Sequence, residues 1–392
     1  MSASSESPSV RSTSSVARWL TVIVVAVACI ALGPWIGYVR AWMRDAFPGR
    51  FGAIVNSLVA VLVLTASLAA IVRIREARKR RYVYLALALG VALVSARMTA
   101  TASANQNAVE RFHFIEYGVV TWLCYRAALR EALGRATKPI VDASVLIVPV
   151  LMATMAGTVD EWFQWFVPER VGEWRDVLLN FSAIGAGILF SLGVEPPVAF
   201  SRTWFPGSRR RIALAALAAW LVIAAFVTTV HLGTMVDDEK AGRFRSRYDA
   251  AQLGALAADR TARWRVEPPP ATPPRFSRED QYLSEGLWHV QARNKAWEAD
   301  IGRAWLENRV LEAYFDPVLD VRTNVVPVSR WPAEQRRDAE SRAAQLGAIP
   351  SESRAEPLPI YAWPRSIYWS VVGLIAGILF WIARRGDRGP SL

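Results

Sequence analysis

The stretch Trp19–Val39 reads WLTVIVVAVACIALGPWIGYV and contains no charged residue. A helix of about 20 mainly apolar residues is long enough to cross the hydrocarbon core of a membrane. Lipid offers the backbone no hydrogen-bond partner, so a span of this kind must be helical. The stretch therefore predicts a transmembrane helix.

Similar apolar blocks recur along the chain, in which 53% of the 392 residues are hydrophobic. The two weakest predictions are the block 82–97, which is short, and the block 114–130, which carries Arg126 and Arg130 near its end. We expect an all-α, polytopic membrane protein with about eight transmembrane helices. The seven blocks after the first are 52–72, 82–97, 114–130, 140–157, 177–195, 212–233 and 366–383.

The distribution of basic residues predicts the orientation of these spans. The loop 73–81 holds six Lys or Arg residues against the single acidic Glu76, and short loops rich in Lys and Arg stay in the cytoplasm. Alternating crossings then place both termini in the cytoplasm and residues 234–365 outside, in a multi-pass protein of the plasma or inner membrane. The loop with Arg40, Arg44 and Arg50 would lie outside in this arrangement, against the rule. The more basic loop 73–81 and the remaining loops outweigh it. The net charge of +12 comes mostly from such flanks, and no nucleic-acid-reading motif accompanies it.

The predicted spans and their orientation divide the chain into four parts. Residues 1–18 form a Ser-rich cytoplasmic tail that we expect to be disordered. A transmembrane bundle follows over 19–233, and a mainly helical extracytoplasmic domain over 234–365. A final transmembrane helix and a cytoplasmic tail occupy 366–392.

The extracytoplasmic domain shows helical patterning interrupted by proline. We expect a charged helix over 237–263, a stiff linker over 268–274, and one amphipathic helix from Ser277 to the Asp316-Pro317 stop. On that helix Glu285, His289 and Arg293 share a face. They are either surface ion pairs or a face that contacts a ligand or a protein partner.

Ionisable residues open the fourth predicted span. His113, Glu116 and Tyr117 are spaced three and four residues apart, which places them on one face of a helix. A charged side chain at the centre of a membrane helix costs about 2.5–3.5 kcal/mol on insertion scales. Such groups therefore face the bundle interior or water.

A second polar motif lies between the fifth and sixth predicted spans. Asp160, Glu161 and Gln164 come with aromatic residues in a short piece that we expect to lie in the membrane interface, ending at Pro168. Arg170 follows it. Asp176 and Asn180 are one turn apart at the head of the next span, and Gly185 and Gly187 permit close packing there.

The alternation of spans brings both motifs to the outer side of the membrane, where we expect them to form one polar cluster. Two interpretations remain open: a structural network that locks the helices together, and a ligand-binding or catalytic site. The predicted cluster comprises His113, Glu116, Tyr117, Asp160, Glu161, Gln164, Arg170, Asp176 and Asn180.

The order and spacing of these residues resemble those of the VanZ-like membrane proteins. The resemblance covers about residues 80–195 and departs from the family over Phe181–Gly185, where a small residue is shifted or replaced. It rests on His113-Phe114, Glu116-Tyr117-Gly118, Asp160-Glu161, Gln164, Phe166, Pro168, Arg170, Gly172, Asp176, Asn180 and Gly185. It implies a cell-envelope protein, because the namesake of the family is associated with low-level resistance to the glycopeptide antibiotic teicoplanin. It implies no defined reaction.

Three hypotheses for function follow. In the first, the cluster binds an amphiphile such as a membrane lipid headgroup or a lipoglycopeptide, without a cofactor or metal. The second is an interfacial enzyme that acts on a lipid or lipid-linked substrate. His113 or Glu116 would be the general base, Asp160 or Asp176 its partner, and Arg170 would bind an anionic group of the substrate. A divalent cation at Asp160, Glu161 and Asp176 would fit this hypothesis. The third is a transporter, which the absence of a convincing internal repeat disfavours.

Overall fold

The computed structural model describes residues 8–100, 104–135, 139–167, 172, 174–267, 269, 281–321, 329–355 and 360–385. The chain separates into two compact units. The membrane unit comprises Met1–Gln164, Gly172–Ala225 and Val371–Leu392, and the polar unit comprises Trp165–Val171 and Phe226–Ser370.

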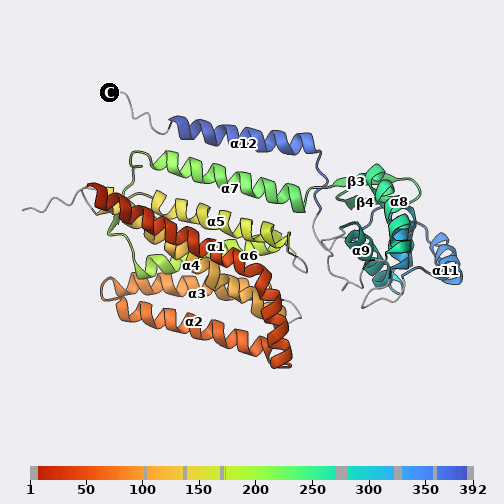
Figure 1. Cartoon of the computed structure of the whole chain (residues 1–392), viewed down its shortest axis with the longest axis horizontal. Helices are drawn as coiled ribbons and strands as arrows, with labels where there is room; N and C mark the ends of the chain where they lie inside the picture. Colours follow the sequence, from red (N-terminus) through yellow and green to blue (C-terminus); the bar gives the residue numbers. More distant parts are fainter. Residues whose placement is uncertain are drawn as a thin grey trace, which may run out of the picture. The chain divides into compact units, whose positions relative to one another are not determined.

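Long helices make up the membrane unit (Figure 1). They are α1 (Pro8–Ala46), α2 (Phe51–Arg73), α3 (Arg78–Met98), α4 (Ala104–Arg135), α5 (Ser144–Gln164), α6 (Trp174–Val194), α7 (Ser208–Val230) and α12 (Arg365–Arg385). Within the described residues, seven of them contain a stretch long and apolar enough to cross a membrane. The prediction of an all-α, multi-pass membrane protein is thus confirmed.

Helix α4 is the exception among the eight, since it lacks an apolar stretch of that quality. The predicted span 114–130 is its middle part. It packs against α1, α2, α3, α5 and α6 and buries Tyr117, Val120 and Cys124 among them. A helix that neighbouring helices surround can carry polar residues that lipid would not tolerate, which explains why this span was the hardest to predict.

Two boundary predictions for the membrane unit are wrong. Helix α1 already begins at Pro8, so the stretch 8–18 is helical, while residues 1–7 lie outside the described part. Proline is well tolerated in the first turn of a helix, and serine lowers helix stability without ending it. Helix α5 continues to Gln164 rather than ending at residue 157, so Asp160 and Glu161 belong to this long helix and not to a separate interfacial piece.

The crossing of α4 and α6 depends on one of the two glycines noted in the sequence. A Cβ atom at Gly187 would lie 3.0 Å from Thr121 Cβ and 3.1 Å from Gly118 Cα and O. A Cβ atom at Gly185 would meet nothing within 4 Å, so the prediction of close packing holds for Gly187 alone.

Replacing Gly187 by alanine is expected to destabilise the membrane unit by about 1–3 kcal/mol, because the backbone of α4 cannot move aside. The melting temperature of the purified full-length protein in detergent measures this. Gly185→Ala is the matched control; it should be neutral or stabilising by up to about 1 kcal/mol, since alanine favours the helix. Equal melting temperatures for the two variants would contradict the assigned crossing.

Two sets of polar contacts stabilise the ends of helices and the adjoining loops in the membrane unit. Arg81 at the start of α3 donates from Nε to the carbonyl oxygen of Gly193 at 2.7 Å and from Nη2 to that of Val194, the last residues of α6. A cation at these free carbonyls complements the helix dipole. Asp142 accepts from the backbone N–H of Phe205 at 2.6 Å, beside the short parallel pair β1 (Ile140–Val141) and β2 (Ala199–Phe200).

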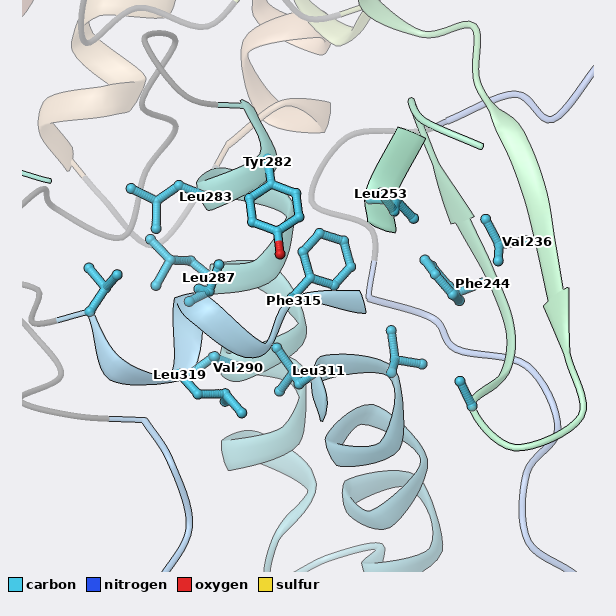
Figure 2. Packing of buried hydrophobic residues seen from close by; sticks show 14 residues of the cluster. Val236, Phe244, Leu253, Tyr282, Leu283, Leu287, Val290, Leu311, Phe315 and Leu319 are labelled. Carbon is cyan, nitrogen blue, oxygen red and sulfur yellow. The ribbon is translucent and has the colours of Figure 1, made fainter. Parts of the chain in front are cut away.

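The polar unit combines one hairpin with short helices. Strands β3 (Thr234–Asp238) and β4 (Gly242–Ser246) pair antiparallel. The helices are α8 (Ala250–Val266), α9 (Gln281–Ala296), α10 (Ile301–Tyr314), the 3₁₀ turn η1 (Asp316–Asp320) and α11 (Ala333–Ala344). Figure 2 shows the main apolar core of this unit, to which the hairpin contributes Val236 and Phe244, α8 contributes Leu253, and α9 contributes Tyr282 and Leu287.

Sequence patterning misjudged this unit in two places. The predicted charged helix 237–263 is a hairpin followed by α8, because Gly242 adopts a positive φ of 89° and Asp238 accepts from the N–H groups of Lys240 and Ala241 in the turn. The predicted long helix is broken into α9 and α10, since Asp300 caps a new helix by accepting from the N–H of Arg303 at 3.0 Å.

Other predictions for the polar unit lie partly outside the described residues. These include Ser277 and most of the proline run 268–274. The proline-rich stretch before α12 is extended where it is described, and it forms bridges from Glu352 to Arg243 and from Tyr361 to Leu232.

Candidate polar site in the helix bundle

Helix α4 presents His113, Glu116 and Tyr117 on one face, as their spacing predicted. His113 Nδ1 lies 3.8 Å from Glu116 Oε2. The rings of His113 and Tyr117 are nearly parallel, with an interplanar angle of 9° and centroids 6.1 Å apart. His113 and Tyr117 are buried, whereas Glu116 is partly exposed.

Helix α5 supplies the facing residues from its last two turns. Gln164 Nε2 donates to Asp160 Oδ2 at 3.1 Å and to Glu161 Oε1 at 3.2 Å, so it bridges the two carboxylates. All three side chains are buried. Asp160 and Gln164 are one turn apart on α5, and they meet inside the bundle rather than on an interfacial piece.

A short hydrogen bond joins the two helices. Tyr117 Oη donates to Asp160 Oδ2 at 2.7 Å, and both residues are at most 5% exposed. Asp160 thus accepts from a hydroxyl of α4 and from an amide of its own helix. These two contacts, from different helices, fix the carboxyl group of Asp160 in position.

Helix α6 approaches through Asn180. Its Nδ2 lies 3.4 Å from the carbonyl oxygen of Gly157 on α5. A Cβ atom at Gly157 would lie 3.2 Å from Asn180 Cβ and 3.3 Å from Tyr117 Cε1, so glycine permits all three helices to meet here. Among the described residues, Asn180 Oδ1 has no hydrogen-bond partner although the residue is 1% exposed.

Three members of this cluster are placed as metal ligands would be. One ligating atom each from His113, Asp160 and Glu161 all lie within 4.8 Å of one another, and all three residues are buried. We call these three residues the ligand triplet. Imidazole nitrogen and carboxylate oxygen are both donor types that bind divalent transition metals such as Zn²⁺.

The remaining predicted members have different outcomes. Asp176 lies partly buried in the first turn of α6, as predicted, and is not part of the ligand triplet found in the described residues. Arg170 lies outside the described residues.

An ion pair that sequence reasoning did not identify lies on the neighbouring face of α4. Arg175 of α6 donates from Nη2 to Glu110 Oε1 at 2.9 Å and to the carbonyl oxygen of Thr99 at 2.6 Å. A small gap between α3, α4 and α6 lies beside this pair and has no room for a water molecule. It is lined by Ala96, Thr99, Asn107, Glu110, Arg111, Phe114 and Leu179.

The polar face predicted in the second unit is also buried. Glu285, His289 and Arg293 are at most 3% exposed, so the interpretation as surface ion pairs is wrong. The helical spacing was correct, but it could not reveal that the hairpin and α10 cover this face.

Glu285 is held by the hairpin. It accepts from Ser246 Oγ at 2.6 Å and from the backbone N–H of Arg247 at 3.2 Å, and its Oε1 lies 3.5 Å from Arg247 Nη1. The Arg247 guanidinium lies 4.6 Å from the Trp165 ring centroid. Burial raises the pKa of Glu285 and lowers the pKa of Arg247, because it disfavours the charged form of each.

The other two residues of this face join α9 to α10. His289 Nδ1 lies 2.6 Å from Glu307 Oε2, and Glu307 also accepts from Ser353 Oγ at 2.7 Å. Arg293 donates to Asn308 Oδ1 at 2.9 Å, and burial lowers its pKa to about 10. Each polar group here has a protein partner, which is the arrangement of a structural network.

Comparison with known proteins identifies no relative of this chain. No protein-family model matches the chain, and neither a curated protein nor a solved structure matches it.

Proposed function

We propose that this chain is a VanZ-like integral membrane protein of the cell envelope that binds the polar head of an amphiphilic ligand at the polar cluster in the helix bundle. This cluster comprises His113, Tyr117, Asp160, Glu161, Gln164 and Asn180. The ligand would be a membrane lipid or a lipoglycopeptide. The observation that carries the proposal is the burial of His113, Asp160 and Glu161 together, close to the end of the bundle where α5 ends and α6 begins.

The cost of this arrangement argues for a function. Ionisable groups inside a membrane bundle are expensive, and they commonly mark sites for a ligand, an ion or a proton. Two carboxylates and an imidazole at one depth exceed what is needed to join three helices, since Gly157 and Gly187 already allow these helices to pack closely.

The charged groups beside the cluster favour an amphiphile as the ligand. Glu110 precedes His113 by one helical turn on α4 and pairs with Arg175 of α6. A border of charged groups next to the apolar bundle would suit a headgroup that is attached to acyl chains.

Native mass spectrometry of the full-length protein, extracted mildly from its membranes, tests this proposal. We expect about one amphiphile to be retained per chain after detergent is removed in the gas phase. Loss of all bound lipid and lipoglycopeptide under conditions that preserve the folded protein would contradict it.

The orientation is part of the proposal, with the polar unit outside the cell and the loop 73–81 in the cytoplasm. Cys29 and Cys124 would first be replaced by alanine, and a single cysteine introduced at exposed Ser341 or exposed Lys79. A membrane-impermeant maleimide applied to intact cells should label Ser341→Cys and spare Lys79→Cys. The reverse pattern would overturn the orientation.

An interfacial enzyme is the second candidate, favoured by the distances within the ligand triplet. His113 would act as general base and Asp160 as its partner on a lipid-linked substrate. Variants His113→Ala and Asp160→Ala that are expressed normally and leave the cellular phenotype intact would exclude this candidate.

A further inference from the structure

We infer that the ligand triplet His113, Asp160 and Glu161 holds a divalent transition-metal cation, of which Zn²⁺ is the best match, and that this cation receives a phosphate-bearing headgroup. The inference rests on the proposed function and names the class of ligand. It differs from the cation site considered from the sequence, because His113 takes the place of Asp176.

Geometry is the first argument. The three ligating atoms lie within 4.8 Å of one another. Atoms bound to one cation at about 2.0–2.2 Å must lie within roughly 4.4 Å of one another, so small side-chain movements bring all three to the metal. His113 comes from α4, whereas Asp160 and Glu161 come from α5. Their backbones are held by the Gly157 contact and by the Tyr117–Asp160 hydrogen bond.

The donor set selects the class of metal. Mg²⁺ and Ca²⁺ prefer oxygen ligands, whereas an imidazole nitrogen suits Zn²⁺ and its neighbours in the transition series. Zinc sites with three protein ligands leave a fourth position for water or substrate. A phosphate oxygen can occupy that position.

The surroundings provide the supporting contacts that metal ligands need. Tyr117 Oη and Gln164 Nε2 both donate to Asp160 Oδ2, and Gln164 also donates to Glu161 Oε1. Such hydrogen bonds orient ligating carboxylates.

Asn180 is an independent indication of a ligand. Asn180 and Tyr117 both border Gly157 on α5, one turn before Glu161, and Asn180 Oδ1 has no hydrogen-bond partner in the described part of the chain. A buried amide oxygen without a partner is unusual in a folded protein. A water molecule or hydroxyl group on the cation would provide its donor.

The first measurement is the binding of Zn²⁺ alone to full-length protein that has been stripped with a chelator. We expect one Zn²⁺ per chain by calorimetry and by elemental analysis. His113→Gln and Glu161→Gln should each weaken binding at least tenfold, while Asp176→Asn, a carboxylate on α6 outside the ligand triplet, should bind as the wild type does. Zinc binding that is absent from the wild type, or unchanged in both triplet variants, would overturn the inference. Melting temperatures confirm that each variant is folded.

The second measurement separates this inference from the proposed function. Native mass spectrometry compares phosphatidylglycerol with diacylglycerol of the same chains, on the stripped and the zinc-loaded protein. Retention of phosphatidylglycerol that requires zinc supports the inference. Retention that is equal with and without zinc overturns the inference and leaves amphiphile binding standing. Zinc binding without retention of any amphiphile contradicts the proposed function and the headgroup part of the inference, and leaves the zinc site standing.

Discussion

Replacing Asp160 by asparagine is expected to weaken binding of the retained amphiphile at least tenfold, which is about 1.4 kcal/mol. Asp160 accepts hydrogen bonds from Tyr117 and Gln164 and is 5% exposed. The amide keeps the size of the side chain but removes its charge and introduces a donor where two donors already point. A titration of detergent-solubilised wild type and variant with the amphiphile identified in the wild type measures the change.

The matched control for this prediction is Asp176→Asn. Asp176 is an acidic residue in the same region, partly buried in the first turn of α6, and it does not belong to the ligand triplet. Its affinity should remain within about twofold of the wild type, or roughly 0.4 kcal/mol. If both variants bound equally well, the binding site would not be centred on Asp160.

Replacing Arg247 by alanine is expected to destabilise the polar unit by about 3–5 kcal/mol, because it leaves the buried Glu285 without its cation. The change also removes the hydrogen bonds from Arg247 to the carbonyl oxygen of Val230 and the contact with the Trp165 ring. Hydrogen exchange of peptides within 281–320 in the full-length protein measures the loss of protection.

Two further variants determine whether the charge pair explains this loss. Arg337→Ala removes an exposed arginine of α11 and should change protection by less than about 0.5 kcal/mol. The double variant Arg247→Met/Glu285→Gln replaces both charges with groups of similar volume and should recover most of the stability. A single Arg247→Ala variant as stable as Arg337→Ala would contradict the assigned role of the pair.

The sequence predicted the membrane class and most helices because block length and hydropathy are local properties. Ala104–Arg135 shows where this fails: its polar residues reduce its hydropathy, and only its neighbours in the bundle explain why it is tolerated. The prediction of where α5 ends was wrong for another reason. Aromatic residues at 162–166 resemble an interfacial piece, but no helix-breaking residue separates Gly157 from Gln164.

The site was predictable as a set of helix faces and not as a set of contacts. Spacing placed His113, Glu116 and Tyr117 on one face of α4. It could not pair Tyr117 with Asp160, which are 43 residues apart, nor show that Gly157 lets Asn180 approach them. The buried face at Glu285, His289 and Arg293 had the same limitation, since its partners lie on the hairpin and on α10.

The central claim is that an amphiphile headgroup occupies the polar cluster, and photo-crosslinking measures its position directly. A phospholipid carrying a diazirine in its headgroup would be loaded onto the full-length protein, and the adducts mapped by peptide mass spectrometry. We predict headgroup adducts on peptides that contain His113 of α4 and on those that contain Asp160 to Gln164 of α5, with a strong reduction in Asp160→Asn. Adducts confined to the exposed apolar surfaces of α2 and α12, and unchanged in that variant, would contradict the account.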